Sequence, residues 1–149
     1  MTVRRGRRIA FDFGSVRIGV AACDPDGIFA SPVTTLQAGA TDLWLQIDTL
    51  ITDLEPIEIY VGKPIHLGGQ SSDSTDAAVQ FAQTLGEKFA IPVTLIDERL
   101  STVSGARKLQ EVGINAKKSK AVIDQVAAVG ILEFALEIEA GLNKRGKNE

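Results

Sequence analysis

Three acidic residues that lie far apart in the sequence occupy positions where a carboxylate is unusual. Asp12 lies inside the apolar segment 8–13, although aspartate disfavours strands. Glu98 follows a second apolar segment, directly after Asp97, and Asp124 shares a helical face with small apolar residues. An unpaired charge in the setting of Asp12 costs several kcal/mol, so we expect a cationic group to compensate it.

The chemistry that such acids support is metal-dependent. If the carboxylates converge, they repel one another and raise each other's pKa unless a cation lies among them. Oxygen ligands suit Mg²⁺ or Mn²⁺, and two such ions about 3.5–4 Å apart can activate water and stabilise the leaving oxygen of a phosphodiester. We therefore predict that Asp12, Glu98 and Asp124 are the metal ligands and catalytic residues, with Asp97 as the alternate to Glu98.

Each acid also has a simpler interpretation, which the sequence leaves open. Asp12 could initiate the turn at residues 14–15, with Arg17 as its nearest counter-charge. Asp97 could cap a helix that begins near Ser101, although capping explains Glu98 poorly. Asp124 could pair with a nearby lysine, either Lys117 or Lys120.

The elements that must position these acids follow from the hydrophobic periodicity. Strands are predicted at residues 7–13, 17–23, 28–34, 57–61 and 92–96. Helices are predicted from residue 41 to 54 with Thr41 or Asp42 as N-cap, then along the face of Ala78, Phe81, Leu85 and Phe89, then at 101 to about 112 and 119 to about 140. Three hairpin-linked strands followed by βα alternation predict an α/β fold, with a mixed five-stranded sheet and helices on its faces.

The composition is that of one compact domain. A chain of 149 residues that is 44% hydrophobic can bury one core, and we expect a single domain over residues 1–149 with flexible tails at 1–6 and 141–149. The single cysteine, Cys23, excludes a disulfide framework and a cysteine-based zinc site. No run approaches the roughly 20 apolar residues of a membrane span, so we expect a soluble, cytoplasmic protein.

The distribution of charge is more informative than its sum. The net charge of −3 argues against a polyanionic partner. However, Arg4, Arg5, Arg7 and Arg8 have no acid among them, and residues 99–120 hold six basic residues against the single acid Glu111. These two segments could line one basic surface, or they could be ordinary solvated charges.

Four motifs carry a resemblance to a known family. They are D-F-G-S-V-R-I-G-V-A at residues 12–21, V-G-K-P at 61–64, D-E-R-L-S-T at 97–102 and I-D-Q-V-A-A at 123–128. In order and spacing they resemble the YqgF/RuvX family over roughly residues 8 to 135. That family has an RNase H-like fold related to Holliday-junction resolvases, and its members are described as nucleases that mature the 5′ end of pre-16S ribosomal RNA.

The resemblance implies a site and a substrate. The family's metal-binding acids fall on Asp12, Glu98 and Asp124, and Lys63 stands where the family usually has leucine. The expected partner is precursor rRNA, with branched DNA as the alternative, bound by a monomer or a homodimer. We expect the nucleic acid to contact Arg17, Lys63, Arg99, Arg107, Lys117 and Lys118.

Two rival functions come from other classes. A catalytically weak factor that binds RNA during ribosome assembly would keep the fold and lose the cleavage. An actin-like ATPase or sugar kinase also begins with D-x-G after a strand, but it needs two such domains and this chain has one D-x-G strand.

Overall fold

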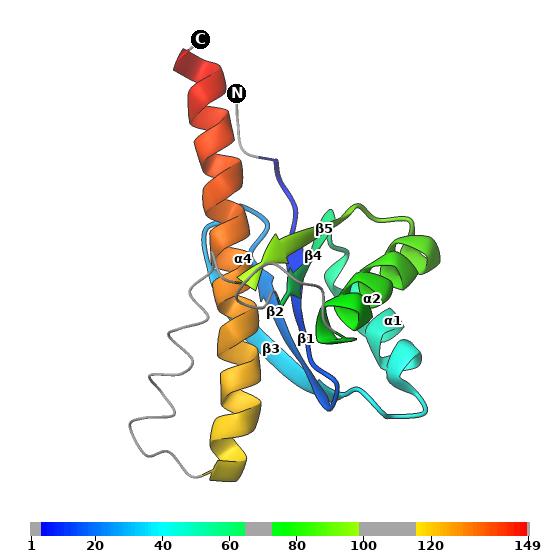
Figure 1. The fold of residues 1–149 in the computed structure, drawn as a ribbon. Coiled ribbons are helices and arrows are strands. Elements are labelled where there is room, and N and C mark those ends of the chain that lie inside the picture. The colour runs from blue at the N-terminus through cyan, green and yellow to red at the C-terminus, as the bar shows by residue number, and fades with distance from the viewer. Residues whose placement is uncertain (1–3, 65–72, 99–115, 149) are drawn as a thin grey trace.

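The computed structural model describes residues 4–64, 73–98 and 116–148, and the side chains of residues 4–64, 75–98 and 122–141. The helix expected at residues 101–112 lies outside these ranges. Within them the chain folds around one mixed sheet with helices on both faces (Figure 1). The predicted α/β architecture is therefore confirmed.

The sheet contains five strands in the order β3-β2-β1-β4-β5. Strands β1 (Arg8–Phe13), β2 (Arg17–Cys23) and β3 (Ala30–Gln37) form an antiparallel meander. Strand β4 (Glu58–Lys63) lies parallel to β1, and β5 (Val93–Asp97) lies parallel to β4 at the edge. The first strand is thus central, with β2 and β4 on either side.

Two layers of helix cover the sheet. Helices α1 (Leu43–Leu54) and α2 (Asp73–Phe89) pack on one face, and α4 (Ala116–Asn148) crosses the other (Figure 1). Strand alternation divides β1 between them: Phe11 packs toward α1 and α2, whereas Ala10 packs toward α4. Asp12, two residues after Ala10, therefore lies on the α4 side of the sheet.

The third strand begins later than predicted. Residues 28 and 29 were expected within it, but Ile28 and Phe29 are exposed and the strand starts at Ala30. The Asp24 side chain accepts hydrogen bonds from the backbone N–H groups of Asp26, Ile28 and Phe29, and these bonds lower its pKa. These hydrogen bonds keep Ile28 and Phe29 in the turn, although their hydrophobicity predicted that they belong to the strand.

The fourth strand and the last helix are both longer than predicted. Strand β4 continues through Gly62 and Lys63, which were expected in a loop. Helix α4 spans 33 residues and continues to Asn148, past the end predicted near residue 140. Apolar periodicity marks only the part of a helix that contacts the core, so it stops where the sheet stops. No helix in the described part of the chain is long and apolar enough to cross a membrane.

Candidate active site

Asp12 lies between two glycines on the surface of the sheet. Its cross-strand partner on β2 is Gly19, and on β4 Gly62 follows Val61, which pairs with Phe11. Directly opposite residues share a face, so both glycines leave open space beside the Asp12 side chain. The central carboxylate therefore has room for other groups on both sides.

Glu98 occupies the space over Gly62. A Cβ added at Gly62 would lie 2.7 Å from Glu98 Oε1 and 2.4 Å from the Cδ1 atom of Ile131. Glu98 is also hydrogen-bonded to the Asp12 side chain. Asp97, its alternate, pairs in register with Lys63, and strand alternation directs it to the other face. The side chain that the structure joins to Asp12 is thus Glu98.

Asp124 approaches over the other glycine. A Cβ on Gly19 would lie 2.0 Å from the backbone oxygen of Asp124, so α4 touches β2 at this point. The predicted small apolar face permits this approach, because Ala127, Ala128 and Ile131 are all buried against the sheet. This face brings Asp124 to the surface of the sheet, with its side chain 18% exposed.

Arg17 pairs with a different acid from the one expected. Arg17 was expected to compensate Asp12, but its Nε donates to Asp124 Oδ2 at 2.7 Å. Both side chains are partly exposed, at 30% and 18%. Arg17 and Gly19 lie two residues apart on the same face of β2, which brings the guanidinium to α4.

Burial, together with the hydrogen bond and charge of Glu98 and the charge of Asp124, raises the pKa of Asp12 to about 9. Two carboxylates share a hydrogen bond only when one carries a proton. With its pKa raised to about 9, Asp12 carries this proton at neutral pH. Among the described side chains, the guanidinium of Arg17 on Asp124 is the cationic group that the structure places against one of the three acids.

A cavity of about 640 Å³ opens beside Asp12. Its lining consists of Asp12, Phe13, Gly14, Ser15, Pro64, Ala77 and Glu98. Two of the three predicted catalytic acids thus face one open space large enough for a ligand.

The donor atoms at this site fit a hard divalent cation in type. All three are carboxylate groups, and the central one is held neutral by burial and by its acidic neighbours. Among the described side chains, however, no three acidic, histidine or cysteine groups are placed so that they could hold one metal ion. Asp124 is the acid that is bound elsewhere, to Arg17.

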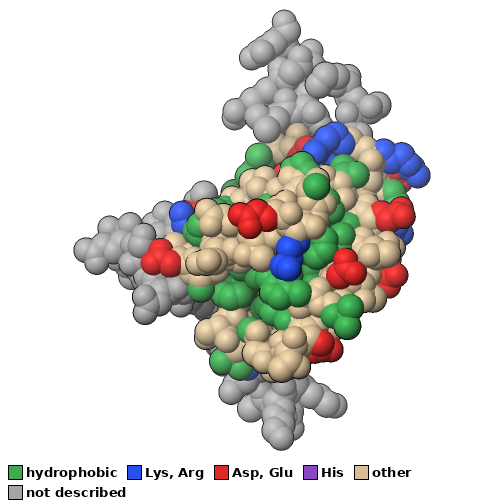
Figure 2. All heavy atoms as spheres, turned by 90° about the vertical axis from the view of Figure 1, so that its right-hand side faces the viewer, with side chains coloured by type: hydrophobic (Ala, Val, Ile, Leu, Met, Phe, Trp, Pro, Cys, Tyr) green, Lys and Arg blue, Asp and Glu red, His purple; other side chains and the backbone are tan. Residues whose placement is uncertain are grey.

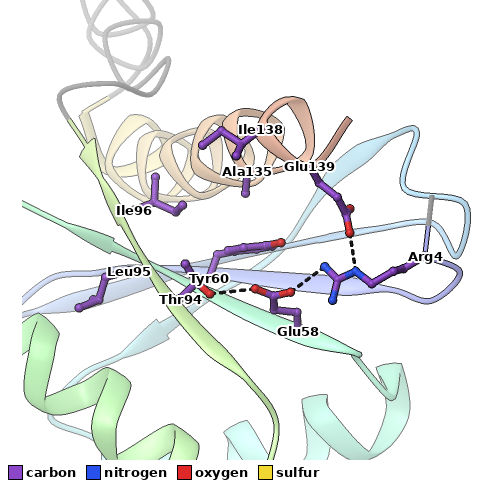
Figure 3. A pocket seen from close by; sticks show the side chains of 9 residues that line it. All are labelled: Arg4, Glu58, Tyr60, Thr94, Leu95, Ile96, Ala135, Ile138 and Glu139. Carbon is purple, nitrogen blue, oxygen red and sulfur yellow. Dashed lines mark hydrogen bonds and ion pairs between the residues drawn. The ribbon is translucent and has the colours of Figure 1, made fainter. Parts of the chain in front are cut away.

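A second cavity, of about 510 Å³, lies at the other end of the sheet (Figure 3). Its polar groups bond to one another: Arg4 contacts Glu58 at 2.7 Å and Glu139 at 2.5 Å, and Thr94 donates to Glu58 at 2.8 Å. The remaining walls, including Leu95 and Ile138, are apolar. Because these charged groups already have partners, we place the candidate site at Asp12 instead.

The N-terminal arginines do not form a free basic surface, which was one of the two interpretations that the sequence left open. Arg8 is fully buried and donates from Nη2 to Glu139 Oε2 at 2.6 Å. Arg4 pairs with the same glutamate, and Arg5 pairs with Asp26. Three of the four arginines therefore neutralise acids of the fold.

The other predicted nucleic-acid contacts are not tested. Lys63 is the last residue of β4 and pairs in register with Asp97. Because it follows Gly62, which shares a face with Asp12, strand alternation places Lys63 on the opposite face of the sheet. Arg99 and Arg107 lie outside the described residues, and Lys117 and Lys118 lie in α4 with side chains outside the described set.

Sequence reasoning missed Gly19 and Gly62 as parts of the site. A glycine inside a strand weakens the strand and often marks the close approach of another backbone or a ligand. Gly19 lies within a predicted strand, so this signal was present for it in the sequence, whereas Gly62 follows the predicted strand 57–61 and carried no such signal.

Comparison with solved structures defines the class of fold. The structure resembles that of Thermus thermophilus RuvC, with a TM-score of 0.57 and 13% identity over 91% of this chain and 96% of the other. RuvC of the same organism in complex with a Holliday junction substrate matches with a TM-score of 0.56. The chain therefore has the RNase H-like fold.

Sequence comparison identifies the family. Residues 6–138 match the family RuvX, described as Holliday junction resolvase, and the chain belongs to this family. A Mycolicibacterium smegmatis protein named "Putative pre-16S rRNA nuclease" is 49% identical over 89% of this chain and 81% of its own length. A Streptomyces coelicolor protein of the same name is 45% identical over 92% and 83%.

Proposed function

We propose that this protein is a cytoplasmic, metal-dependent nuclease that hydrolyses phosphodiester bonds at the 5′ end of pre-16S rRNA. The observation that carries the proposal is the buried carboxyl of Asp12, joined to Glu98 and flanked by the two glycines over which Glu98 and Asp124 stand. The names of relatives at 45–49% identity support the choice of substrate.

In this proposal the three acids hold Mg²⁺ or Mn²⁺ next to the 640 Å³ cavity. The bound cation would activate the attacking water and stabilise the leaving oxygen. Asp12, the central acid, would hold the cation in its ionised form, and the close packing over Gly19 and Gly62 would fix the neighbouring acids relative to it. Glu98 rather than Asp97 is proposed as the second ligand.

The nucleic acid is proposed to approach along the α4 side of the sheet, where Asp12 lies. The opposite face supports this choice, because its exposed acids include Asp48, Asp53 and Glu55. In Figure 2, which views the α1 and α2 side, the described basic side chains are few and scattered among acidic ones. A polyanion would find little attraction there.

Cleavage of a labelled precursor rRNA end, with Mg²⁺ or Mn²⁺, tests the proposal. We expect Asp12→Asn and Glu98→Gln to lose at least about 100-fold in rate, because loss of a group that merely supports a metal ligand costs 10–100-fold. Asp97→Asn is the matched control and should cut within a few-fold of wild type. If Asp12→Asn cuts as well as wild type, the site lies elsewhere.

Cleavage of branched DNA is the second candidate function, because the family description is Holliday junction resolvase. A four-way DNA junction should therefore be assayed beside the RNA. Symmetric cutting of two strands requires a dimer, so the oligomeric state on the junction is measured in the same experiment. If neither substrate is cut with any metal, a non-cleaving RNA-binding role replaces both.

A further inference from the structure

We propose that Arg17 is a built-in counter-ion of Asp124, which competes with the catalytic cation for this carboxylate and is released toward substrate phosphate when the cation binds. This inference rests on the proposed metal-dependent function and adds a role for a residue outside the three acids.

The first step is the geometry of the contact. Arg17 Nε lies 2.7 Å from Asp124 Oδ2, a distance typical of a charge-assisted hydrogen bond. Arg17 belongs to β2 and Asp124 to α4, so the bond joins two elements separated by 107 positions in sequence. The contact therefore depends on the fold and is not a local feature of one helix.

The bond to Arg17 occupies the carboxylate that would complete the set of three acids. Asp12 and Glu98 are already joined, and both line the cavity, whereas Asp124 does not. No three acids among the described side chains are placed to hold one metal ion. Completing a three-carboxylate set therefore requires Asp124 to exchange Arg17 for the cation.

The third step concerns the charge that Arg17 meets at Asp124. A divalent cation bound to Asp124 would offset much of the negative charge that attracts the guanidinium to this carboxylate. A guanidinium binds phosphate in the same planar geometry as carboxylate. With its side chain 30% exposed, Arg17 can exchange one anion for the other.

If Arg17 competes with the cation, removing Arg17 should strengthen metal binding. Removing a competitor should tighten metal binding, whereas damage to the fold would weaken it. Titration calorimetry with Mn²⁺ and no nucleic acid should therefore give a dissociation constant for Arg17→Gln that is lower by about three- to fivefold, the effect of displacing a partly exposed ion pair. Arg17→Lys retains the charge and should lie between Arg17→Gln and wild type.

Two controls locate the effect. Arg5→Gln breaks another arginine–aspartate pair, with the exposed Asp26, and should leave Mn²⁺ affinity unchanged. In an Asp124→Asn background, Arg17→Gln should give much less gain, because the contested carboxylate is gone. An unchanged or weaker Mn²⁺ affinity in folded Arg17→Gln overturns the inference, as does an equal gain in the Asp124→Asn background.

The release toward phosphate has its own readout. Binding of a cleavage-resistant phosphorothioate RNA is measured against salt concentration, with Mn²⁺ and with chelator. Arg17→Gln should reduce the salt slope by about 1 with Mn²⁺ and leave it unchanged with chelator, because one phosphate contact is lost only in the loaded protein. Equal slopes for wild type and variant in Mn²⁺ would refute this half.

Failure of the inference can be told apart from failure of the proposed function. If wild type cuts neither nucleic acid but Arg17→Gln binds Mn²⁺ more tightly, the nuclease proposal fails and the competition stands. If wild type cuts and the Mn²⁺ affinity does not rise, only the competition fails.

Discussion

The backbone oxygen of Asp124 lies directly over Gly19, so close that a Cβ on this glycine would come within 2.0 Å of it. Gly19 is also the cross-strand partner of Asp12. One glycine therefore sets both the distance of α4 from the sheet and the space between two of the three acids. Several consequences of this packing are open to measurement.

Gly19→Ala should both destabilise the protein and impair the site. The added methyl group meets backbone, which cannot rotate away, so we expect a loss of about 1–3 kcal/mol in the free energy of unfolding. Cleavage should fall by about 100-fold, because a displacement of about 1 Å near a catalytic group has such an effect. Urea denaturation and the cleavage assay measure both; Gly39→Ala, with no atom within 4 Å of the added Cβ, is the control.

Gly62→Ala should affect the site more than the fold. Its added Cβ meets the ends of two flexible side chains, Glu98 and Ile131, so the loss of stability should be about 1 kcal/mol. The displaced Glu98 should weaken Mn²⁺ binding in calorimetry. Gly86→Ala, inside α2 with only an ordinary contact to Val93, should instead raise stability by about 0.5–1 kcal/mol. Unchanged Mn²⁺ affinity in Gly62→Ala would contradict the proposed role of Glu98.

The sequence indicated the positions of the three acids in the fold more completely than the ion pairs of the arginines. Asp12 was recognisable because a charged residue inside an apolar strand is unusual, and the alternation of β5 separated Asp97 from Glu98. The partners of Arg4 and Arg8 were not recognisable, because Glu139 lies 135 and 131 positions away in sequence. Clusters of like charge in a sequence do not show which opposite charges the fold brings to them.

The stability of the metal-free protein should depend on the pH through Asp12. Burial and the neighbouring acids raise its pKa in the folded state to about 9 from the ordinary 3.8, so the folded state binds a proton more tightly than the unfolded state. Its contribution to stability is therefore present below about pH 4 and is lost as the pH rises toward 9.

Thermal melts in chelator, from pH 5 to 9, compare wild type with Asp12→Asn. Because asparagine does not ionise, the difference in Tm should move in favour of the variant as the pH rises. A constant difference across this range would show that Asp12 does not hold its proton in the folded protein. Excess Mn²⁺ should reduce the pH dependence of wild type, since the cation replaces the proton.

The buried pair of Arg8 and Glu139 should be a strong anchor of α4 on the sheet. The Arg8 side chain is fully buried and that of Glu139 is 13% exposed, and removing one member of such a pair costs about 3–5 kcal/mol. Arg8→Met should fall at the lower end of this range in urea denaturation, because Arg4 still neutralises Glu139. Arg5→Ala breaks a pair whose side chains are 76% and 55% exposed, and should cost less than about 1 kcal/mol.

The double variant Arg8→Met with Glu139→Leu separates the charge from the packing at this anchor. Apolar replacement of both partners in a buried pair is often neutral or stabilising. We therefore expect the double variant to recover much of the stability that Arg8→Met loses, although Arg4 then keeps only Glu58 as a partner. If the double variant is less stable than Arg8→Met alone, Glu139 holds α4 through Arg4, and the anchor belongs to that exposed arginine and not to Arg8.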